Sequence, residues 1–195
     1  MKQLALGISP APQPTLENFV PGTNAELLAR LREFRAGKFP DCVLYLWGEA
    51  GSGKSHLLQA CAGSNVVDDV EKLDDAAQIA LFNVINEARQ SGGAVLAAGN
   101  APPAQLPLRE DLKSRLAWGL VYQVKQLSDD DRSTYLRAEA ARRGMHMPEE
   151  AIGYLLTRMR RDMRSLNAVL DRIDQVSLEL KRPITLPLVR EAIKE

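Results

Sequence analysis

The chain has 195 residues with 25 basic and 25 acidic side chains, so its formal net charge is zero. It contains no apolar run of the roughly 18 residues that a membrane-spanning helix needs, and its N-terminus lacks the charged-then-apolar layout of a signal peptide. Its two cysteines and two histidines stand in no metal-ligand spacing, which argues against metal or Cys/His catalysis. We therefore expect a cytoplasmic protein made of one domain, or of one domain and a small lid.

The N-terminal third of the chain is expected to contain a proline-rich tail, a helix, a buried strand and a second helix. Four prolines within residues 9–21 predict that the tail is flexible. Asn24 and Gly37 are the expected N-cap and end of the first helix, and the nearly continuous apolar run of the strand indicates burial on both faces. In chain order these elements cover 1–14, 25–36, 42–47 and about 54–62.

Short apolar runs and helical patterns then alternate along the chain. The first helix of this part begins at Asp74 and Asp75 and is expected to turn Ile79, Phe82 and Ile85 toward the core. The alternation predicts an α/β fold with a parallel sheet flanked by helices. The strands are expected at 66–67, 94–98 and 120–124, and the helices at 74–91 and around 109–116.

From Ser128 onward the pattern is helical. Ser128, with Asp131 three residues later, is typical of an N-cap followed by first-turn acids, and Gly144 is expected to end that helix. Two further helices carry apolar stripes at helical spacing, which indicates a packed core. We therefore predict a lid of three helices over 128–195, joined to an α/β base over 15–127.

Residues 48–55, Gly-Glu-Ala-Gly-Ser-Gly-Lys-Ser, match the phosphate-binding pattern GxxxxGK[ST] between a strand and a helix. Glycines let amide N–H groups surround one anion, and the helix N-terminus adds partial positive charge. The lysine reaches the outer phosphates, and the last hydroxyl can ligate Mg²⁺. We therefore expect ATP or ADP with Mg²⁺ to be held by Gly48, Gly51, Ser52, Gly53, Lys54 and Ser55, with His56 directly beside them.

Polar residues follow two other strands, where a Mg²⁺-nucleotide site requires them. Asp68 and Asp69 come directly after strand 66–67; Asp68 is expected to hold the metal through water, and Asp69 to orient or activate the attacking water. Asn100, just past strand 94–98, is expected to position a water near the outermost phosphate. The alternative for all three is a role in a turn.

Two arginines are candidates for stabilising charge on a transferring phosphate. Arg115 lies before the last strand of the sheet, and Arg164 lies near the start of a lid helix. On spacing alone, either could equally be a surface arginine.

Together these segments resemble the DnaA branch of the AAA+ ATPases, from about residue 3 to the end of the chain. The resemblance implies that Phe19 and Val20 help to hold the adenine and that Asp68 and Asp69 form the Walker B pair. It also implies three further roles: sensor 1 for Asn100, arginine finger acting on a neighbouring subunit's nucleotide for Arg115, and sensor 2 for Arg164. The segments that carry the resemblance are 15–22, 48–55, 66–70, the Asn100 loop, 114–116 and 163–166.

Within that branch the chain resembles the Hda family of regulatory inactivators of DnaA. The sequence ends with the lid, whereas DnaA continues into a DNA-binding domain, so direct sequence-specific DNA binding is not expected. In addition, Gln3-Leu4-Ala5-Leu6-Gly7 resembles the short peptide by which many proteins bind the β sliding clamp. Gln3, Leu4 and Leu6 would dock in an apolar groove, although Gly7 replaces the usual large final residue.

The resemblance implies a nucleotide-bound protein that sits on the DNA-loaded clamp and presents Arg115 to ATP on DnaA. Hydrolysis of that ATP would switch off the initiation of replication, while the chain's own turnover would be slow. A homodimer is left open. Two alternatives are a helicase loader of the DnaC type, which shares the P-loop, the arginine finger and the lid, and a stand-alone NTPase or small-molecule kinase, for which the sequence offers no acceptor pocket.

One departure concerns the stretch between the P-loop and the Walker B pair, where AAA+ proteins normally place a strand–helix unit. Only 13 residues, His56 to Asp68, follow Ser55 through the first aspartate. Because a parallel crossover needs about a dozen residues, the return to the sheet is tight. Either the chain lacks an edge strand and its helix, or the sequence omits a segment between Ala62 and Val66.

Overall fold

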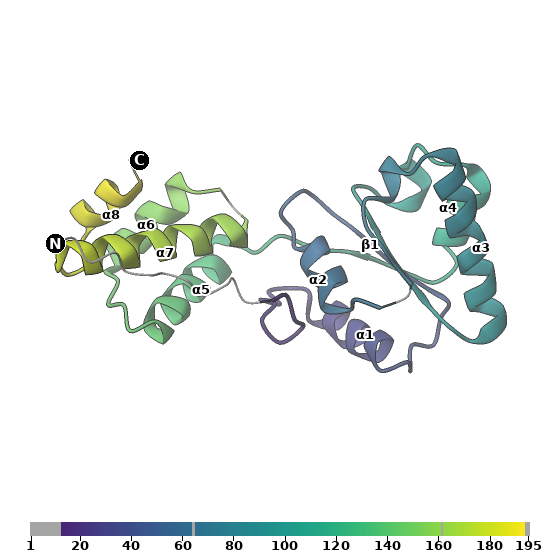
Figure 1. The fold of residues 1–195 in the computed structure, drawn as a ribbon, viewed down its shortest axis with the longest axis horizontal. Helices are drawn as coiled ribbons and strands as arrows, with labels where there is room; N and C mark the ends of the chain where they lie inside the picture. The colour runs from purple at the N-terminus through teal and green to yellow at the C-terminus, as the bar shows by residue number, and fades with distance from the viewer. Residues whose placement is uncertain (1–12, 64, 161, 194–195) are drawn as a thin grey trace. The chain divides into compact units, whose positions relative to one another are not determined.

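The computed structural model describes residues 13–63, 65–160 and 162–193. The chain divides into two compact units, one covering Gln13–Gln126 and the other beginning at Leu127 (Figure 1). We call them the base and the lid. The clamp-binding-like residues Gln3, Leu4 and Leu6 lie outside the described residues.

The base has an α/β fold, as the alternating pattern predicts. Its four strands are all parallel and lie in the order β2-β3-β1-β4. Because parallel neighbours need crossovers, helices cover both faces of the sheet (Figure 1). The elements are α1 (Ala25–Arg35), β1 (Val43–Trp47), α2 (Lys54–Ala60), β2 (Val66–Val67), η1 (Val70–Lys72), α3 (Asp75–Ser91), β3 (Val95–Gly99), η2 (Pro103–Gln105), α4 (Glu110–Leu116) and β4 (Leu120–Gln123).

Burial on both faces explains why β1 reads as an almost unbroken apolar run. Leu44 and Leu46 pack in one core with leucines of α1 and α2, whereas Val43 and Tyr45 pack in a second core with residues of α3 and α4. All four side chains are fully buried. β1 pairs with both β3 and β4, and its last residue, Trp47, is in register with Gly99 of β3 and Gln123 of β4.

The buried face of α3 differs from the prediction at one position. Ile79 is 45% exposed, and the buried residue in that turn is Gln78. Burial of this amide is tolerated because both its ends are bonded: Nε2 donates to the Leu73 carbonyl at 3.0 Å, and Oε1 accepts from the Arg109 N–H at 3.0 Å. The amide thereby joins the start of α3 to the start of α4.

Asn24 occupies the N-cap position of α1 but makes no capping hydrogen bond with its side chain. Its side-chain amide instead pairs with the backbone of Lys125: Nδ2 donates to the Lys125 carbonyl, and Oδ1 accepts from the Lys125 N–H, both at 2.9 Å. The predicted N-cap position is therefore confirmed, but the side chain does not cap the helix. Asn24 ties the start of α1 to the chain just after β4.

Between α2 and the edge strand β2 the chain returns within residues 61–65. β2 has only two residues and pairs with β3 alone among the described strands, with Val66 level with Leu96. The tight connection expected from the sequence is thus made with a minimal strand at the edge of the sheet.

The lid contains four described helices, α5 (Asp129–Arg142), α6 (Glu149–Arg158), α7 (Met163–Leu180) and α8 (Leu186–Ile193), rather than the three predicted. The Ser128 capping box is confirmed: Ser128 Oγ accepts from the Asp131 N–H, and the Asp131 carboxylate accepts from the Ser128 N–H. α8 is only two turns long, with proline in its first turn, where its missing N–H costs nothing. Leu188 and Val189 bury α8 in the single lid core.

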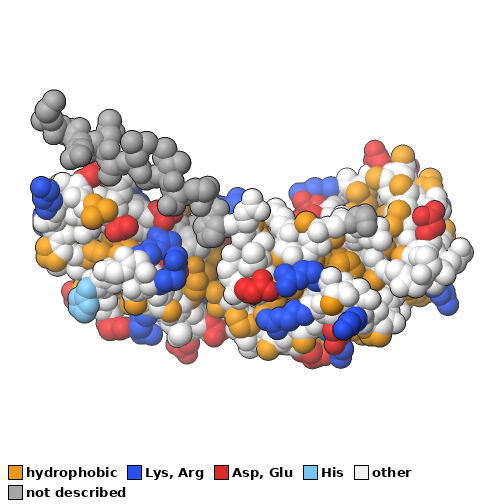
Figure 2. Space-filling view, turned by 60° about the horizontal axis from the view of Figure 1, so that its bottom comes forward, with side chains coloured by type: hydrophobic (Ala, Val, Ile, Leu, Met, Phe, Trp, Pro, Cys, Tyr) orange, Lys and Arg blue, Asp and Glu red, His pale blue; other side chains and the backbone are white. Residues whose placement is uncertain are grey.

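No helix of the described part of the chain is both long and apolar enough to cross a bilayer. On the face seen in Figure 2, acidic and basic side chains are interspersed.

Candidate functional site

The glycine-rich loop leaves the end of β1 and enters α2. Gly53 has φ +99°, a left-handed conformation that favours glycine. A Cβ at Gly53 would lie 2.7 Å from Cε2 of Phe19, and a Cβ at Gly48 would lie 2.5 Å from the Val124 carbonyl oxygen. The loop is therefore packed so closely on its neighbours that larger side chains cannot enter. These contacts explain why glycine is required at both positions of the loop.

Lys54 is folded along this loop. Its Nζ donates to the carbonyl oxygens of Gly48 at 2.7 Å and Glu49 at 3.1 Å. Burial lowers the pKa of Lys54, while the carboxylates of Asp68, Glu71 and Asp69 act in the opposite direction. The ammonium group thus stands between the loop and a group of acidic side chains.

Ser52 supplies an unpaired polar atom in the same loop. Ser52 is 7% exposed, and its hydroxyl has no hydrogen-bond partner among the described residues. A buried hydroxyl without a partner is costly, so a phosphate oxygen would satisfy it. The Ser52 hydroxyl is thus a donor that an anion in the loop would use.

The acidic side chains reach the loop because parallel strands end at the same edge of the sheet. Asp68 follows β2, and its Oδ1 accepts from the Asp69 N–H at 2.9 Å. Asp69 has φ +50°, and its half-exposed carboxylate forms an ion pair with Lys72 at 2.7 Å. The oxygen donors of Asp68 and the exposed Ser55 are the type that Mg²⁺ prefers. When bound, Mg²⁺ would neutralise phosphate charge between them.

Glu71 is a site residue that the motif analysis missed. Its Oε2 accepts from the backbone N–H of Asn100 at 3.3 Å, and it lies close to Gly99, where a Cβ would come within 3.1 Å of the same oxygen. Its charge also acts on Lys54 and raises the pKa of Tyr45, which is raised mainly by burial. The only sequence signal was an acid three residues after Asp68, in a segment that had no predicted structure.

Asn100 lies immediately after β3 and is exposed. Its backbone contact with Glu71 places it at the same edge of the sheet as the P-loop and the 68–71 segment. The structure therefore brings together three of the predicted groups, although the role of the Asn100 side chain remains a prediction.

The segment before α1 packs against the other side of the loop. Leu16 is buried, and the half-buried Phe19 touches Gly53 and lies 5.5 Å from the ring of His56, centroid to centroid. Nε2 of His56 is 2.9 Å from the Thr15 carbonyl oxygen, which requires that nitrogen to donate its hydrogen. His56 thus ties the segment that carries Phe19 and Val20 to α2.

Residues 124–126, the last of the base, are joined to the same machinery. The Val124 carbonyl abuts Gly48, and Lys125 is paired with Asn24. The side-chain amide of Gln126 donates to Glu49 Oε2 at 3.1 Å and to the Ala50 carbonyl at 3.2 Å.

Arg115 lies apart from these groups, on the face of α3 and α4. Its Nε donates to Oδ1 of Asn86 at 3.0 Å. Its guanidinium carbon lies 3.6 Å from the ring centroid of Trp118 and 5.0 Å from that of Phe82. The half-buried arginine is thus held by a neutral amide and two aromatic rings.

Arg164 is the second residue of α7 in the lid and is exposed. The start of α7 is fixed by Asp162, whose carboxylate accepts from the Ser165 N–H at 2.8 Å. This N-cap orients the first turn of the helix, from which Arg164 projects.

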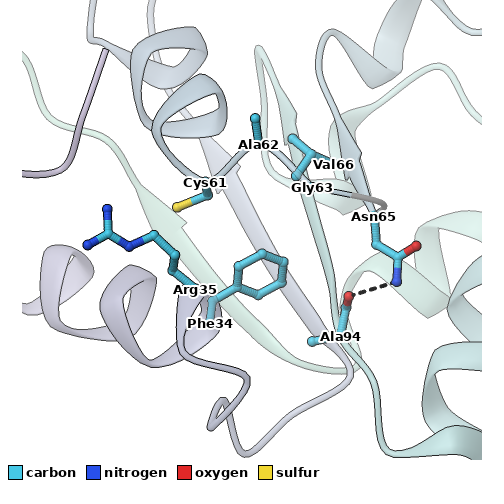
Figure 3. A pocket seen from close by; sticks show the side chains of 8 residues that line it. All are labelled: Phe34, Arg35, Cys61, Ala62, Gly63, Asn65, Val66 and Ala94. Carbon is cyan, nitrogen blue, oxygen red and sulfur yellow. Dashed lines mark hydrogen bonds between the residues drawn. The ribbon is translucent and has the colours of Figure 1, made fainter. Parts of the chain in front are cut away.

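A separate pocket lies at the opposite end of the sheet, where β2 and β3 begin (Figure 3). Phe34 and Cys61 line one side, and Asn65 donates to the Ala94 carbonyl at 3.3 Å on the other. Burial raises the pKa of the Cys61 thiol to about 11, so the thiol stays protonated. This pocket shares no residue with the P-loop.

Comparisons with known proteins agree with this architecture. Residues 129–193 match the family "Hda, lid domain". Domain III of the replication initiation protein DnaA from Thermotoga maritima superposes with a TM-score of 0.75 at 21% identity, over 95% of this chain and 98% of that one. AMPPCP-bound DnaA from Aquifex aeolicus gives 0.70 at 21% identity, over 86% and 66%.

The RuvB Holliday junction branch migration motor of Thermotoga maritima has a TM-score of 0.70 at 17% identity, over 94% of this chain and 72% of that one. RuvB and DnaA thus share the base-and-lid fold with this chain, and the lid adds the family match. The chain therefore has the fold of DnaA domain III and RuvB, and its residues 129–193 match the Hda lid family.

Proposed function

We propose that this chain is a cytoplasmic regulator of replication initiation that binds ATP or ADP with Mg²⁺ and promotes hydrolysis of ATP held by DnaA. Arg115 acts as the arginine finger, and residues 3–6 attach the protein to the β sliding clamp. The Hda lid match and the similarity to AMPPCP-bound DnaA support the choice of partner and ligand.

The observation that carries the proposal is the separation of Arg115 from its own P-loop. Arg115 stacks on Trp118, and the next residue, Gly119, packs against the Val43 carbonyl at the start of β1, whereas the P-loop follows the end of β1 at Trp47. An arginine placed on another face cannot serve the phosphates of its own chain. It is, however, available to a nucleotide carried by a neighbouring AAA+ subunit.

Within the chain's own site, each group has a task that its surroundings support. The P-loop amides, Ser52 and Lys54 hold the phosphates, and Ser55 with Asp68 would hold Mg²⁺. Asp69 or Asn100 orients water, and Phe19 and Val20 hold the base of the nucleotide, with His56 fixing their segment. Because Asp69 is paired with Lys72, its pairing must break before it can act, which fits slow turnover.

On the partner, the Arg115 guanidinium would stabilise charge that develops on the transferring phosphate. The lid arginine Arg164 would instead contact the nucleotide of its own chain and report its state. Neither role requires the chain to recognise a DNA sequence.

The experiment is single-turnover hydrolysis of ATP prebound to DnaA, with clamp-loaded DNA and increasing amounts of this chain. Arg115→Ala should abolish stimulation yet leave the ADP affinity of the chain unchanged by calorimetry. Lys54→Ala should weaken that affinity by about a hundredfold, whereas Lys38→Ala, an exposed lysine after α1, should not. Full stimulation by Arg115→Ala would refute the trans mechanism.

The clamp assignment has its own test, since the peptide lies outside the described residues. In a pull-down with sliding clamp, the doubly substituted Gln3→Ala/Leu6→Ala chain should be lost from the bound fraction. Equal binding of both chains would show that attachment lies elsewhere, and capture by a replicative helicase instead of the clamp would favour a helicase loader.

A further inference from the structure

The guanidinium groups of Arg115 and Arg89 both lie over the ring of Trp118. Of the two arginines, only Arg115 is an expected functional residue. The ring centroid is 3.6 Å from the guanidinium carbon of Arg115 and 4.2 Å from that of Arg89. Arg89 lies in the last turns of α3, and Trp118 follows α4. The indole is 37% exposed, so the cluster lies at the surface of the base.

Neither guanidinium forms an ion pair with a carboxylate of the described residues. Arg115 has a neutral amide as its acceptor, and the contact of Arg89 within the described part of the chain is with the indole. Three other arginines of the base are neutralised, in the pairs Arg30–Glu33, Arg35–Glu17 and Arg109–Asp111. The two cations on Trp118 therefore differ from these in lacking a counter-charge.

The spacing of the two cations suits one phosphate chain. Both distances end on the same centroid, so the guanidinium carbons lie within about 8 Å of each other. A phosphorus atom hydrogen-bonded by a guanidinium lies about 4 Å from its carbon. Oxygens of one phosphate group, or of two adjacent groups, can thus be reached from both sides, and their charge would relieve the repulsion between the arginines.

We propose that Arg89 is a second phosphate-binding arginine, which grips the same phosphate chain of a neighbouring subunit's nucleoside triphosphate as Arg115. Trp118 holds the two guanidinium planes by stacking, which leaves their N–H groups directed around the ring edge toward an anion. This assignment rests on the proposed trans action of Arg115 and adds a residue to it.

The test compares Arg89→Ala and Arg89→Lys with the original chain in the DnaA hydrolysis assay, at saturating amounts of each. Arg89→Ala should lower the maximal rate at least tenfold while changing the half-saturating concentration less than threefold. Lysine keeps the charge but not the planar fork, so it should recover part of the rate. Arg32→Ala, an exposed arginine of α1 outside the cluster, is the matched control and should behave like the original chain.

A second readout follows Trp118 directly. In a Trp47→Phe background Trp118 is the only tryptophan, so its emission reports the cluster. Adding DnaA with AMPPCP should change the emission more than adding DnaA with ADP, and both Arg89→Ala and Arg115→Ala should remove the difference.

The outcomes separate the two proposals. If the original chain stimulates hydrolysis and Arg89→Ala does so equally well, Arg89 is not a phosphate ligand, although the trans mechanism stands. If Arg89→Ala raises only the half-saturating concentration, Arg89 binds an acidic surface of the partner instead. If the original chain gives no stimulation, the proposed function fails, and this inference fails with it.

Discussion

Glu71 and Asn100 are joined at the edge of the sheet by a hydrogen bond from the Asn100 N–H to the Glu71 carboxylate, at 3.3 Å. The bond links the segment after β2 to the end of β3 and sets a carboxylate near Lys54. The second carboxylate expected from the sequence, Asp69, is engaged with Lys72 instead. Asp69 is therefore paired with a lysine side chain, whereas Glu71 is bonded only to a backbone N–H among the described contacts.

Glu71→Gln distinguishes between these acids. The glutamine oxygen can still accept from Asn100, so the backbone link is retained while the charge is lost. We expect the chain's own ATP hydrolysis, followed over hours in single turnover, to slow at least about tenfold, with ADP affinity within a factor of three. Asp69→Asn is the comparison. An unchanged rate in Glu71→Gln would limit Glu71 to a structural role.

Gly53→Ala should destabilise the base. The new Cβ would meet the Phe19 ring at 2.7 Å, and φ is +99°, so we expect the free energy of unfolding to fall by about 1–3 kcal/mol. The displaced Phe19 should also weaken nucleotide binding. Gly153→Ala is the control, because a Cβ there meets nothing within 4 Å inside α6 and should stabilise the helix by up to about 1 kcal/mol. Thermal denaturation measures both.

The lid should lose stability in acid through Glu139. Hydrogen bonds from Arg142 and then Arg143 lower the pKa of Glu139 to about 2, against the opposing effect of burial. Because the folded-state pKa lies below the unfolded value of about 4.3, the stabilisation is complete above the unfolded value and is lost as the pH falls toward 2.

Glu139→Gln should therefore lower the Tm of the lid transition at pH 7 by about 2–6 °C, corresponding to roughly 1 kcal/mol after solvent screening. The difference from the original chain should shrink steadily below pH 4 and vanish near pH 2. Glu150→Gln, an exposed glutamate of α6, should show no comparable difference at any pH. A gap that persists at pH 2 would point to packing rather than charge.

The features that could be predicted from the sequence are those encoded locally. The P-loop is a contiguous pattern, and strands of a sheet with helices on both faces are apolar throughout. Both features can therefore be recognised in the sequence. The Ser128 capping box likewise lies within four residues.

The features that could not be predicted depend on partners far along the chain. Asn24 reads as a helix cap, yet its partner Lys125 lies 101 residues away. Gln78 is polar but buried, because Leu73 and Arg109 satisfy it. α8 is too short for its apolar stripe to stand out, and Glu71 enters the site only because its segment folds back toward β3.

The residues that follow β4 attach the end of the base to the P-loop. Of three successive residues, 124 packs against Gly48, 125 pairs with Asn24 and 126 bonds to Ala50. The chain therefore leaves the base while attached both to the P-loop and to the turn that follows Phe19. The residues through which the chain leaves the base are therefore hydrogen-bonded to the loop that is expected to hold the phosphates. Replacing Gln126 with a residue that lacks a side-chain amide would remove its hydrogen bonds to Glu49 and Ala50. Every residue that is expected to hold the phosphates would remain.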